Sequence, residues 1–390
     1  MPHFPFLIKS KLPKIGTTIF TVMSSLASEQ KAINLSQGFP DFEASEDLIR
    51  LVNEFMKKGM NQYAPMQGIL TLRERLAEKT EDLYGISYNP DSEITITSGG
   101  TEAIYTAITA IIREGDEVIV FEPAYDCYVP AIELAGGIPV YISLKAPDFS
   151  IDWKELKKVI NHKTKMIIIN TPHNPTGSVM TAEDMSELEK IVAGTEICIL
   201  SDEVYEHIIF DNLRHESVLH YPLLAERSFV VFSFGKTYHT TGWKIGYCFA
   251  PANLMAEFRK VHQFVVFSAN TPLQYALAEF LKNKNYLALS DYYQNKRDYF
   301  LTLIQGSRFK YVPAKGSYFQ CLDYTSLSDE KDTAFAIRLT KEFKIASIPI
   351  SVFYHNEKDN KILRFCFAKK NETLEMAAEK LCSVLETNVR

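Results

Sequence analysis

The middle of the chain alternates short runs of β-branched residues with stretches of helical periodicity, and this alternation limits the possible folds most strongly. The predicted strands are Ile94–Thr97, Glu117–Phe121, Met166–Asn170, Glu196–Ser201, Phe229–Ser233 and Ile245–Ala250. Helices are predicted between them, for example over Thr101–Arg113 and, after a capping-box-like start at Thr181, over Met185–Val192. Strands that alternate with helices are typical of an α/β domain with a mainly parallel sheet.

The last hundred residues have a different character. A polar, aromatic-rich helical stretch near residues 286–305 precedes a predicted strand at 316–322 and a helix at 333–343. A strand at 361–368 and a closing helix from Glu372 follow. We therefore predict a large domain over 46–285 and a smaller α+β domain over 286–390, with an N-terminal arm and part of the small domain over 1–45.

Composition and charge exclude several classes of function. The formal net charge is -6, from 42 basic and 48 acidic residues, which gives no basic footprint for nucleic acid. We find no apolar stretch of about 18 uncharged residues, so no membrane partner is expected, and residues 1–16 lack the apolar run of a signal peptide. The six scattered cysteines indicate a reduced, cytoplasmic protein.

No metal site is expected either. The pair His215 and His220 is five residues apart, so the two rings miss the shared helix face that an H-E-x-x-H zinc site needs. A zinc hydrolase is therefore disfavoured.

Polar side chains gather after the predicted strands, where ligands bind in open α/β sheets. A Ser-Gly-Gly-Thr turn follows the first strand and opens a helix whose free N–H groups suit a phosphate. The groups that follow later strands are an amide, an acid, a phenol and two lysines: Asn174, Asp202, Tyr205, Lys236 and Lys244.

Each of these residues also has an ordinary structural interpretation. Asn174 could cap its own turn, Asp202 could be a helix N-cap, and Lys236 could be a surface charge. The joint occurrence of all of them at strand ends favours one site. Lysine is the residue that forms Schiff bases, and burial can lower its pKa enough to expose the neutral amine.

Five motifs together resemble the class I aminotransferases of fold type I, over nearly the whole chain. They are Leu35–Asp41, Asn61–Pro65, Asn170–Pro175, Ser201–Glu206 and Ser233–Gly246. The likeness is greatest to bacterial methionine aminotransferases and the related kynurenine aminotransferases (glutamine transaminase K). The resemblance implies pyridoxal 5'-phosphate, bound in the large domain, and ping-pong amino transfer from an amino acid to a 2-oxo acid.

The resemblance also implies a role for each residue around the cofactor ring. Lys236 would hold the aldehyde carbon of the cofactor and then move a proton between the substrate Cα and that carbon. Asp202 would keep the pyridine nitrogen protonated, which makes the ring an electron sink. Asn174 and Tyr205 would bond the ring hydroxyl, and Tyr125 would stack on the ring.

For the phosphate, the resemblance implies Gly100, Thr101, Ser233 and Lys244 as partners. Tyr63 would reach the phosphate of the neighbouring subunit, so the active site would depend on a homodimer. Lys244 stands where the commonest family pattern has arginine, and a lysine supplies a point charge instead of a bidentate fork. This departure fits the kynurenine and methionine branch.

For the substrate, Arg364 would clamp the α-carboxylate, with Asn174 and the backbone of Gly38 beside the same group. Phe20 and Phe267, together with Tyr125, indicate an apolar, aromatic pocket. The segment over 261–271 contains no Lys or Arg that could pair with a side-chain carboxylate. We therefore expect methionine or aromatic amino acids, and not aspartate, as the preferred donors.

Two other functions stay open. β-Elimination on cysteine S-conjugates would use the same cofactor site, because it shares the carbanion with amino transfer. A cofactor-binding regulator without turnover is the second alternative. Such regulators usually carry an added helix-turn-helix region, for which the first 30 residues leave no room.

Overall fold

A large sheet forms the centre of the computed structural model, which describes residues 3–384. Its strands are β2 (Ile94–Thr97), β3 (Glu117–Glu122), β4 (Ile138–Ser143), β5 (Thr164–Asn170), β6 (Cys198–Asp202), β7 (Ser228–Ser233) and β8 (Gly246–Phe249). Within the described range they form a seven-stranded sheet in the order β2-β8-β7-β6-β5-β3-β4. Strands β3 to β7 pair in parallel, and β8 runs antiparallel to β2 and β7. The predicted mainly parallel α/β domain is confirmed.

The six predicted strands are all present, with ends that differ by a few residues. β4, at the edge of the sheet, was not predicted. Its run contains Pro139, and a proline inside a run argues against a strand. Proline is tolerated here because an edge strand has a free side that needs no backbone donor.

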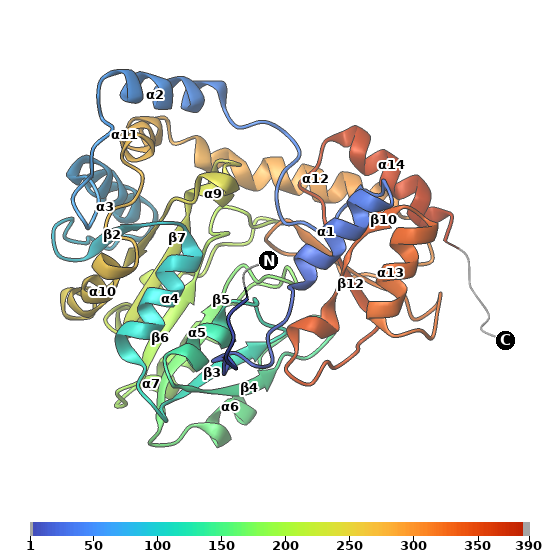
Figure 1. The fold of residues 1–390 in the computed structure, drawn as a ribbon, viewed down its shortest axis with the longest axis horizontal. Helices are drawn as coiled ribbons and strands as arrows, with labels where there is room; N and C mark the ends of the chain where they lie inside the picture. The colour runs from blue at the N-terminus through green and yellow to red at the C-terminus, as the bar shows by residue number, and fades with distance from the viewer. Residues whose placement is uncertain (1–2, 385–390) are drawn as a thin grey trace.

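Helices cover both the sheet and the C-terminal part of the chain. They are α1 (Ile19–Glu29), α2 (Glu46–Lys57), α3 (Leu70–Tyr84), α4 (Gly100–Ile111), α5 (Tyr128–Leu134), α6 (Trp153–Val159), α7 (Ala182–Val192), α8 (Pro222–Ala225), α9 (Phe234–Thr237), α10 (Ala252–Val265), α11 (Thr271–Phe280), α12 (Leu289–Leu303), α13 (Asp332–Glu342) and α14 (Asn371–Cys382). Helix α4 packs on β6 and β7, and Figure 1 shows it lying across the sheet beside α5.

The capping box predicted at the start of α7 is confirmed. Thr181 Oγ1 accepts a hydrogen bond from the backbone N–H of Asp184, and the Asp184 carboxylate accepts one from the backbone N–H of Thr181. The aspartate therefore fills the position that glutamate or glutamine usually takes. The sheet beneath is closely packed, and β2 is buried along its whole length.

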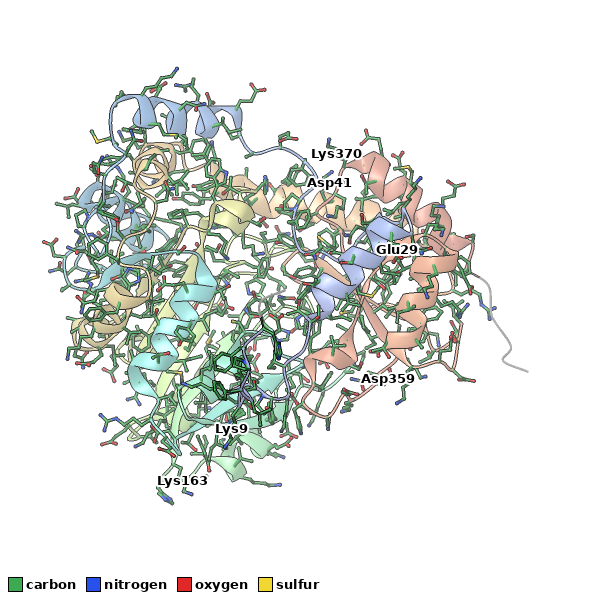
Figure 2. The ribbon with its side chains drawn as sticks, in the orientation of Figure 1. Lys9, Glu29, Asp41, Lys163, Asp359 and Lys370 are labelled. Carbon is green, nitrogen blue, oxygen red and sulfur yellow. The ribbon has the colours of Figure 1, made fainter. Side chains whose placement is uncertain are left out.

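The C-terminal part contains strands of two small sheets, and one of these sheets includes a strand from the N-terminal segment. The strands are β9 (Phe319–Asp323), β10 (Ile345–Ala346), β11 (Ile348–Pro349) and β12 (Ile362–Cys366), with β1 (Ile33–Asn34) from the N-terminal side. Strands β11, β12 and β9 form an antiparallel sheet, and β1 pairs in parallel with β10. The Asp41 carboxylate accepts hydrogen bonds from the Lys370 backbone N–H at 2.6 Å and the Thr373 hydroxyl at 2.7 Å (Figure 2). Residues near position 40 are thus attached to the start of α14.

The division into 1–45, 46–285 and 286–390 stays a prediction, and its outermost residues, 1–2 and 385–390, lie outside the described range. Among residues 3–384, no helix is both long enough and apolar enough to cross a membrane.

Candidate active site

A cavity opens at the ends of β5, β6 and β7 and beside the first turn of α4. The space inside it, counting the part that is open to solvent, is about 730 Å³. The residues predicted to surround the cofactor ring and phosphate, apart from Tyr63, all line it: Gly100, Thr101, Tyr125, Asn174, Asp202, Tyr205, Ser233, Lys236 and Lys244. The structure therefore brings these side chains, predicted from separate strand ends, into one site.

Lys236 lies on the short helix α9 directly after β7, with its amine inside this cavity. The Nζ atom donates to the Tyr318 hydroxyl at 3.0 Å and is 3.4 Å from the Gly38 carbonyl oxygen, both neutral acceptors. Burial lowers the pKa of Lys236 to about 8, and the charges of Lys244 and Arg364 act in the same direction. The neutral, nucleophilic amine is thus accessible close to neutral pH.

Asp202 is the last residue of β6, and its carboxylate faces the same cavity. Oδ2 accepts a hydrogen bond from the Tyr128 hydroxyl at 2.6 Å, and Oδ1 accepts one from the Val204 N–H at 3.4 Å. Burial raises the pKa of Asp202 to about 6, although Tyr128, Val204 and the charge of Lys236 act against it. This carboxylate keeps capacity for a further donor from a ligand.

The opposite end of the cavity is formed by the turn between β2 and α4. Gly99 has φ +82°, and a Cβ there would lie 3.3 Å from the Lys244 Nζ atom. Gly100 and Thr101, which begin α4, and Ser233 line the same cavity. A corner without side-chain bulk, with an ammonium group and free N–H donors, suits a phosphate.

Arg364 projects from β12 and is 1% exposed. One Nη atom donates to the Asn174 Oδ1 atom at 2.7 Å, and the other donates to the Ser36 carbonyl oxygen at 2.8 Å. Its Nε atom is buried and has no hydrogen-bond partner among the described residues. A buried guanidinium with a free donor can accept a carboxylate ligand.

Aromatic rings surround this guanidinium. Its central carbon lies 4.0 Å from the ring centre of Phe319, 5.3 Å from that of Phe20 and 5.7 Å from that of Phe353. Gly38 packs against one of these rings, because a Cβ at this position would lie 2.7 Å from the Phe319 Cζ atom. Phe20 therefore lies beside Arg364, and Gly38 lies beside a ring that packs on it; the binding of a substrate by these residues stays a prediction.

Tyr63 and Phe267 are not brought to the cavity within one chain. Their side chains are 82% and 51% exposed, and the two rings pack edge to face with centroids 5.2 Å apart. Their predicted contacts with a cofactor and a substrate stay predictions.

Sequence reasoning missed four residues of the site. Tyr128 bonds Asp202, Tyr318 bonds Lys236, and Phe319 and Phe353 pack on Arg364. Tyr128 had a usable signal, because it follows Tyr125 by three residues at the start of a helix. Tyr318 and Phe353 come from the distant C-terminal part, and no local pattern connects them to the strand ends.

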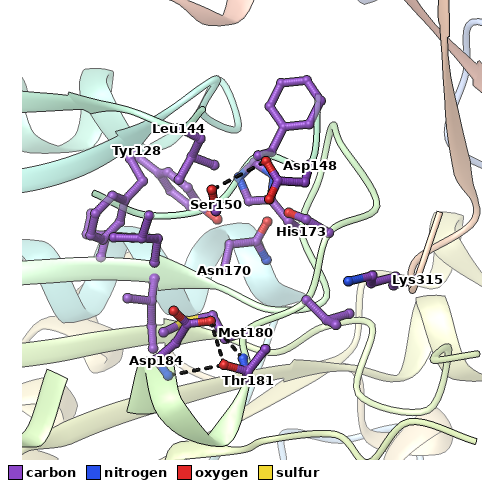
Figure 3. A pocket seen from close by; sticks show the side chains of 17 residues that line it. Tyr128, Leu144, Asp148, Ser150, Asn170, His173, Met180, Thr181, Asp184 and Lys315 are labelled. Carbon is purple, nitrogen blue, oxygen red and sulfur yellow. Dashed lines mark hydrogen bonds between the residues drawn. The ribbon is translucent and has the colours of Figure 1, made fainter. Parts of the chain in front are cut away.

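A second cavity lies beside the turn that follows β5 and shares Asn170 with the first (Figure 3). Its polar side chains already serve local structure. His173 Nδ1 is 2.7 Å from the Thr176 hydroxyl, Asp184 caps α7, and the Ser150 hydroxyl donates to Asp148. It lacks a buried lysine and a phosphate corner in its wall, and we therefore place the active site in the first cavity.

The first cavity fits pyridoxal phosphate. It supplies a buried amine of lowered pKa for the aldehyde, a buried acid for the ring nitrogen and a bulk-free cationic corner for the phosphate.

Comparisons with known proteins agree with this geometry. The family model for aminotransferase class I and II matches residues 30–381. The methionine aminotransferase of Escherichia coli is 50% identical over 383 residues, covering 98% of this chain and 99% of that protein. The kynurenine–oxoglutarate transaminase of Dictyostelium discoideum is 34% identical over 423 residues, covering 97% of this chain and 96% of that protein.

A solved structure gives the same result. A crystal structure from E. coli, for which a methionine aminotransferase function was identified, superposes with a TM-score of 0.95. It is 50% identical, and the match covers 97% of this chain and all of that one. The chain therefore belongs to the class I and II aminotransferase family. It is a transaminase of fold type I that depends on pyridoxal phosphate.

Proposed function

We propose that this transaminase takes the amino group of methionine or an aromatic amino acid and passes it to a 2-oxo acid in a ping-pong reaction. The observation that carries the proposal is the aromatic surrounding of Arg364, formed by Phe20, Phe319 and Phe353. A thioether or an aromatic ring makes favourable contacts with such a wall. The names of the E. coli and Dictyostelium relatives support the same donor class.

The residues of the cavity divide the work. Lys236 Nζ is the group that would hold the cofactor and would move a proton at the substrate Cα. Asp202 holds a proton on the ring nitrogen, while Asn174 and Tyr205 bond the ring hydroxyl. Pyridoxal phosphate, when bound, supplies an electron sink for the negative charge that develops at Cα.

The remaining groups bind and orient. Gly100, Thr101, Ser233 and Lys244 hold the phosphate, and Tyr125 stacks on the ring. Arg364 and Gly38 would hold the substrate α-carboxylate and so orient the substrate for proton transfer by Lys236. Because the cofactor and the substrate α-carboxylate would both be held in place, much of the entropic barrier to the proton transfer is removed.

A panel of donors tests the specificity. Methionine and phenylalanine are expected to exceed aspartate by at least about tenfold in kcat/KM, or about 1.4 kcal/mol, since an aspartate side chain would bring an unpaired charge into the pocket. Aspartate as good as methionine would refute the donor preference and leave the transaminase assignment intact. Pyruvate release from a cysteine S-conjugate, measured in parallel, reports β-elimination separately.

We further propose that the enzyme works as a homodimer with shared active sites. The exposed rings of Tyr63 and Phe267 support this, because two adjacent aromatic side chains at the surface are suited to packing against a second copy. Phe267 would then complete the neighbour's substrate pocket, and Tyr63 would reach the neighbour's phosphate.

Mixed dimers test this arrangement. Tyr63→Phe and Lys236→Ala subunits, each nearly inactive in its own dimer, are expected to regain activity when mixed, because one of the two sites then has both native residues. A mixture no more active than the parent variants would mean that Tyr63 acts within its own subunit.

The free state of all six cysteines supports a reducing compartment, and we propose the cytoplasm.

A further inference from the structure

We propose that Tyr128 is a positioning residue that keeps a proton on the ring nitrogen of the cofactor by acting through Asp202. The inference deepens the proposed function and rests on it. The Tyr128 hydroxyl donates to Asp202 Oδ2 at 2.6 Å, and both side chains are 3% exposed. Tyr128 is not part of the cavity wall around Lys236, and we therefore place it behind Asp202, where it would act on the cofactor through that carboxylate.

The position of Tyr128 follows from the local fold. It is the first residue of α5, three positions after Tyr125, and the two rings meet edge to face with centroids 5.7 Å apart. One side of this segment thus lines the cavity through Tyr125, and the other supports the acid behind the ring. Figure 3 shows the Tyr128 ring also in the wall of the second cavity.

The carboxylate of Asp202 has few other supports. On the protein side, its Oδ1 atom accepts only a 3.4 Å bond from the Val204 N–H among the described residues. The charge of Lys236 favours the anion, whereas the neighbouring Glu203 and burial disfavour it. A hydrogen bond to a charged group is stronger than one between neutral groups. Because the bond from the Tyr128 hydroxyl is 2.6 Å long and the bond from Val204 is 3.4 Å long, Tyr128 gives the strongest direct stabilisation of the anion.

One proton is shared between the ring nitrogen and the carboxylate that faces it. Burial raises the pKa of Asp202 to about 6, which makes the carboxylate a better competitor for this proton. A donor that stabilises the anion lowers its basicity, and the proton then stays on the ring. Without the Tyr128 hydroxyl the proton shifts toward Asp202, and the ring withdraws electrons less strongly.

The test uses holoenzyme loaded with pyridoxal phosphate that carries ¹⁵N in the ring. In wild-type enzyme the ¹⁵N chemical shift is expected to be that of a protonated pyridine, and in Tyr128→Phe it moves toward the neutral value. The kcat/KM for methionine falls about tenfold, mainly in kcat. Tyr88→Phe is the control, because Tyr88 is also a buried tyrosine but packs on Phe249; its ¹⁵N shift and rate stay at the wild-type values.

Two further variants separate positioning from packing. In an Asp202→Asn background, Tyr128→Phe is expected to change the single-turnover rate by less than about twofold, because the group it acts through is gone. Replacing Tyr128 by 3-fluorotyrosine keeps the ring in place and strengthens the donor, so the ¹⁵N shift stays protonated or moves further in that direction.

An unchanged ¹⁵N shift in Tyr128→Phe, or rate losses that simply multiply in the double variant, would overturn the proposal. A neutral ring nitrogen in wild-type enzyme would instead contradict the role proposed for Asp202. Cofactor fixed by borohydride on a lysine other than Lys236 would contradict the proposed function itself.

Discussion

Two lysines beside the same sheet, the buried Lys79 and the half-buried Lys236, have different surroundings. Lys79 donates to the Glu206 carboxylate at 2.5 Å and to the Tyr247 hydroxyl at 2.9 Å. Among residues 3–384, Lys236 has only the neutral oxygens of Tyr318 and Gly38 as hydrogen-bond acceptors. Burial lowers the pKa of both lysines, but at Lys79 the charge and the hydrogen bond of Glu206 oppose that shift. Lys79 is therefore engaged by an acid, whereas Lys236 is available for chemistry. The position of the acidic side chains therefore decides which of the two lysines is structural and which is reactive.

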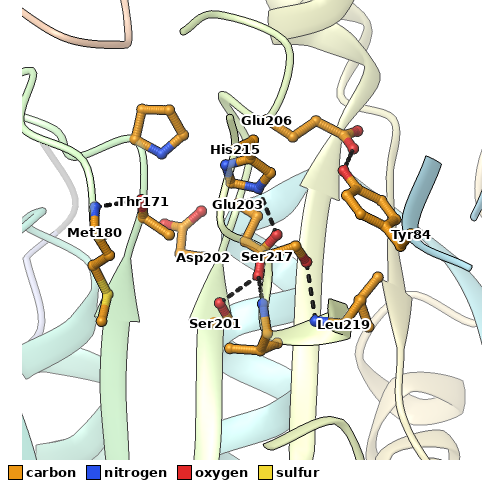
Figure 4. A network of polar contacts seen from close by, with 12 residues as sticks. Tyr84, Thr171, Met180, Ser201, Asp202, Glu203, Glu206, His215, Ser217 and Leu219 are labelled. Carbon is orange, nitrogen blue, oxygen red and sulfur yellow. Dashed lines mark hydrogen bonds and ion pairs between the residues drawn. The ribbon is translucent and has the colours of Figure 1, made fainter. Parts of the chain in front are cut away.

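The acids of one short segment are divided in the same way. Asp202 and Tyr205 line the active-site cavity, whereas Glu203 and Glu206 face a polar network on the other side (Figure 4). Glu203 lies 2.8 Å from His215 Nε2 and accepts further bonds from a serine hydroxyl and a backbone N–H. Burial alone would raise the pKa of Glu206, but its basic neighbours hold it well below the ordinary value. The carboxylates of Glu203 and Glu206 thus have several hydrogen-bond and charge partners each, whereas the carboxylate of Asp202 keeps capacity for a further donor.

The largest effect is expected at the reactive lysine. Lys236→Ala should lower amino transfer by at least about 10⁴-fold, because it removes both the covalent attachment and the proton carrier. The cofactor-free variant should be about as stable as wild type in urea unfolding, since removal of a cation that burial destabilises offsets the loss of its attraction to the Asp202 charge. Borohydride reduction of wild-type holoenzyme should fix the cofactor on the peptide that contains Lys236.

Retained turnover in Lys236→Ala would end the assignment. A large loss of stability in the same variant would instead mean that Lys236 is held by a charge pair like that of Lys79.

The next-largest effect is expected at Lys79, where a substitution should lower stability and leave turnover nearly unchanged. Lys79→Ala should destabilise the protein by about 3–5 kcal/mol, because the buried Glu206 loses its ammonium partner and keeps only the hydroxyls of Tyr84 and Tyr247 and the ring of His207 as described neighbours. Turnover per folded molecule should stay within about threefold of wild type. Urea unfolding and active-site titration measure the two quantities separately.

The matched control removes the pair as a whole. Lys79→Met combined with Glu206→Gln should recover part of the lost stability, since no unpaired charge is left. If Lys79→Ala costs less than about 1 kcal/mol, the two lysines are not different in the way proposed.

The smallest effect is a pH dependence with opposite signs in the two regions. The pKa of Asp202 in the folded, cofactor-free protein is about 6, above the unfolded value of about 3.9. Its contribution is fully present below about pH 4 and is lost as the pH rises through about 6, by up to about 3 kcal/mol. Glu206 has a lowered pKa, so its contribution is present at neutral pH and is lost on acidification.

Asp202→Asn isolates the first contribution. Between pH 4 and pH 7, the unfolding free energy of the variant should rise relative to wild type, as measured by urea unfolding of cofactor-free protein. A difference that does not change with pH would show that Asp202 is not destabilised by burial.

Much of the fold and site could be predicted from sequence because the informative patterns are local. The strands of a buried parallel sheet appear as continuous apolar runs, and the residue types that follow them state the chemistry. Asp202, Lys236 and Asn174 were found in this way, each within a few residues of a predicted strand end. The cavity confirms that they lie together, although their individual roles stay proposals.

The remainder could not be predicted because it depends on contacts between distant parts of the chain. Phe353 and Tyr318 reach the site only through packing of the C-terminal part against the large domain. No periodic pattern in the sequence predicts that contact. The division of the acids in the segment from Asp202 to Glu206 is of the same kind. All three acids look alike in sequence, and only their partners, such as Lys79 and His215, distinguish them.

The aromatic enclosure of Arg364 has a consequence for how the enzyme tells amino acids from simple amines. A flexible arginine normally loses rotamer freedom when it clamps a ligand, at a cost of up to about 2 kcal/mol. Here that ordering takes place during folding, since three rings and the bonds to Ser36 and Asn174 already fix the guanidinium. When an α-carboxylate binds, it therefore replaces existing hydrogen-bond partners of a guanidinium that is already held rigidly. An amine without a carboxylate leaves the existing bonds in place and gains nothing from Arg364.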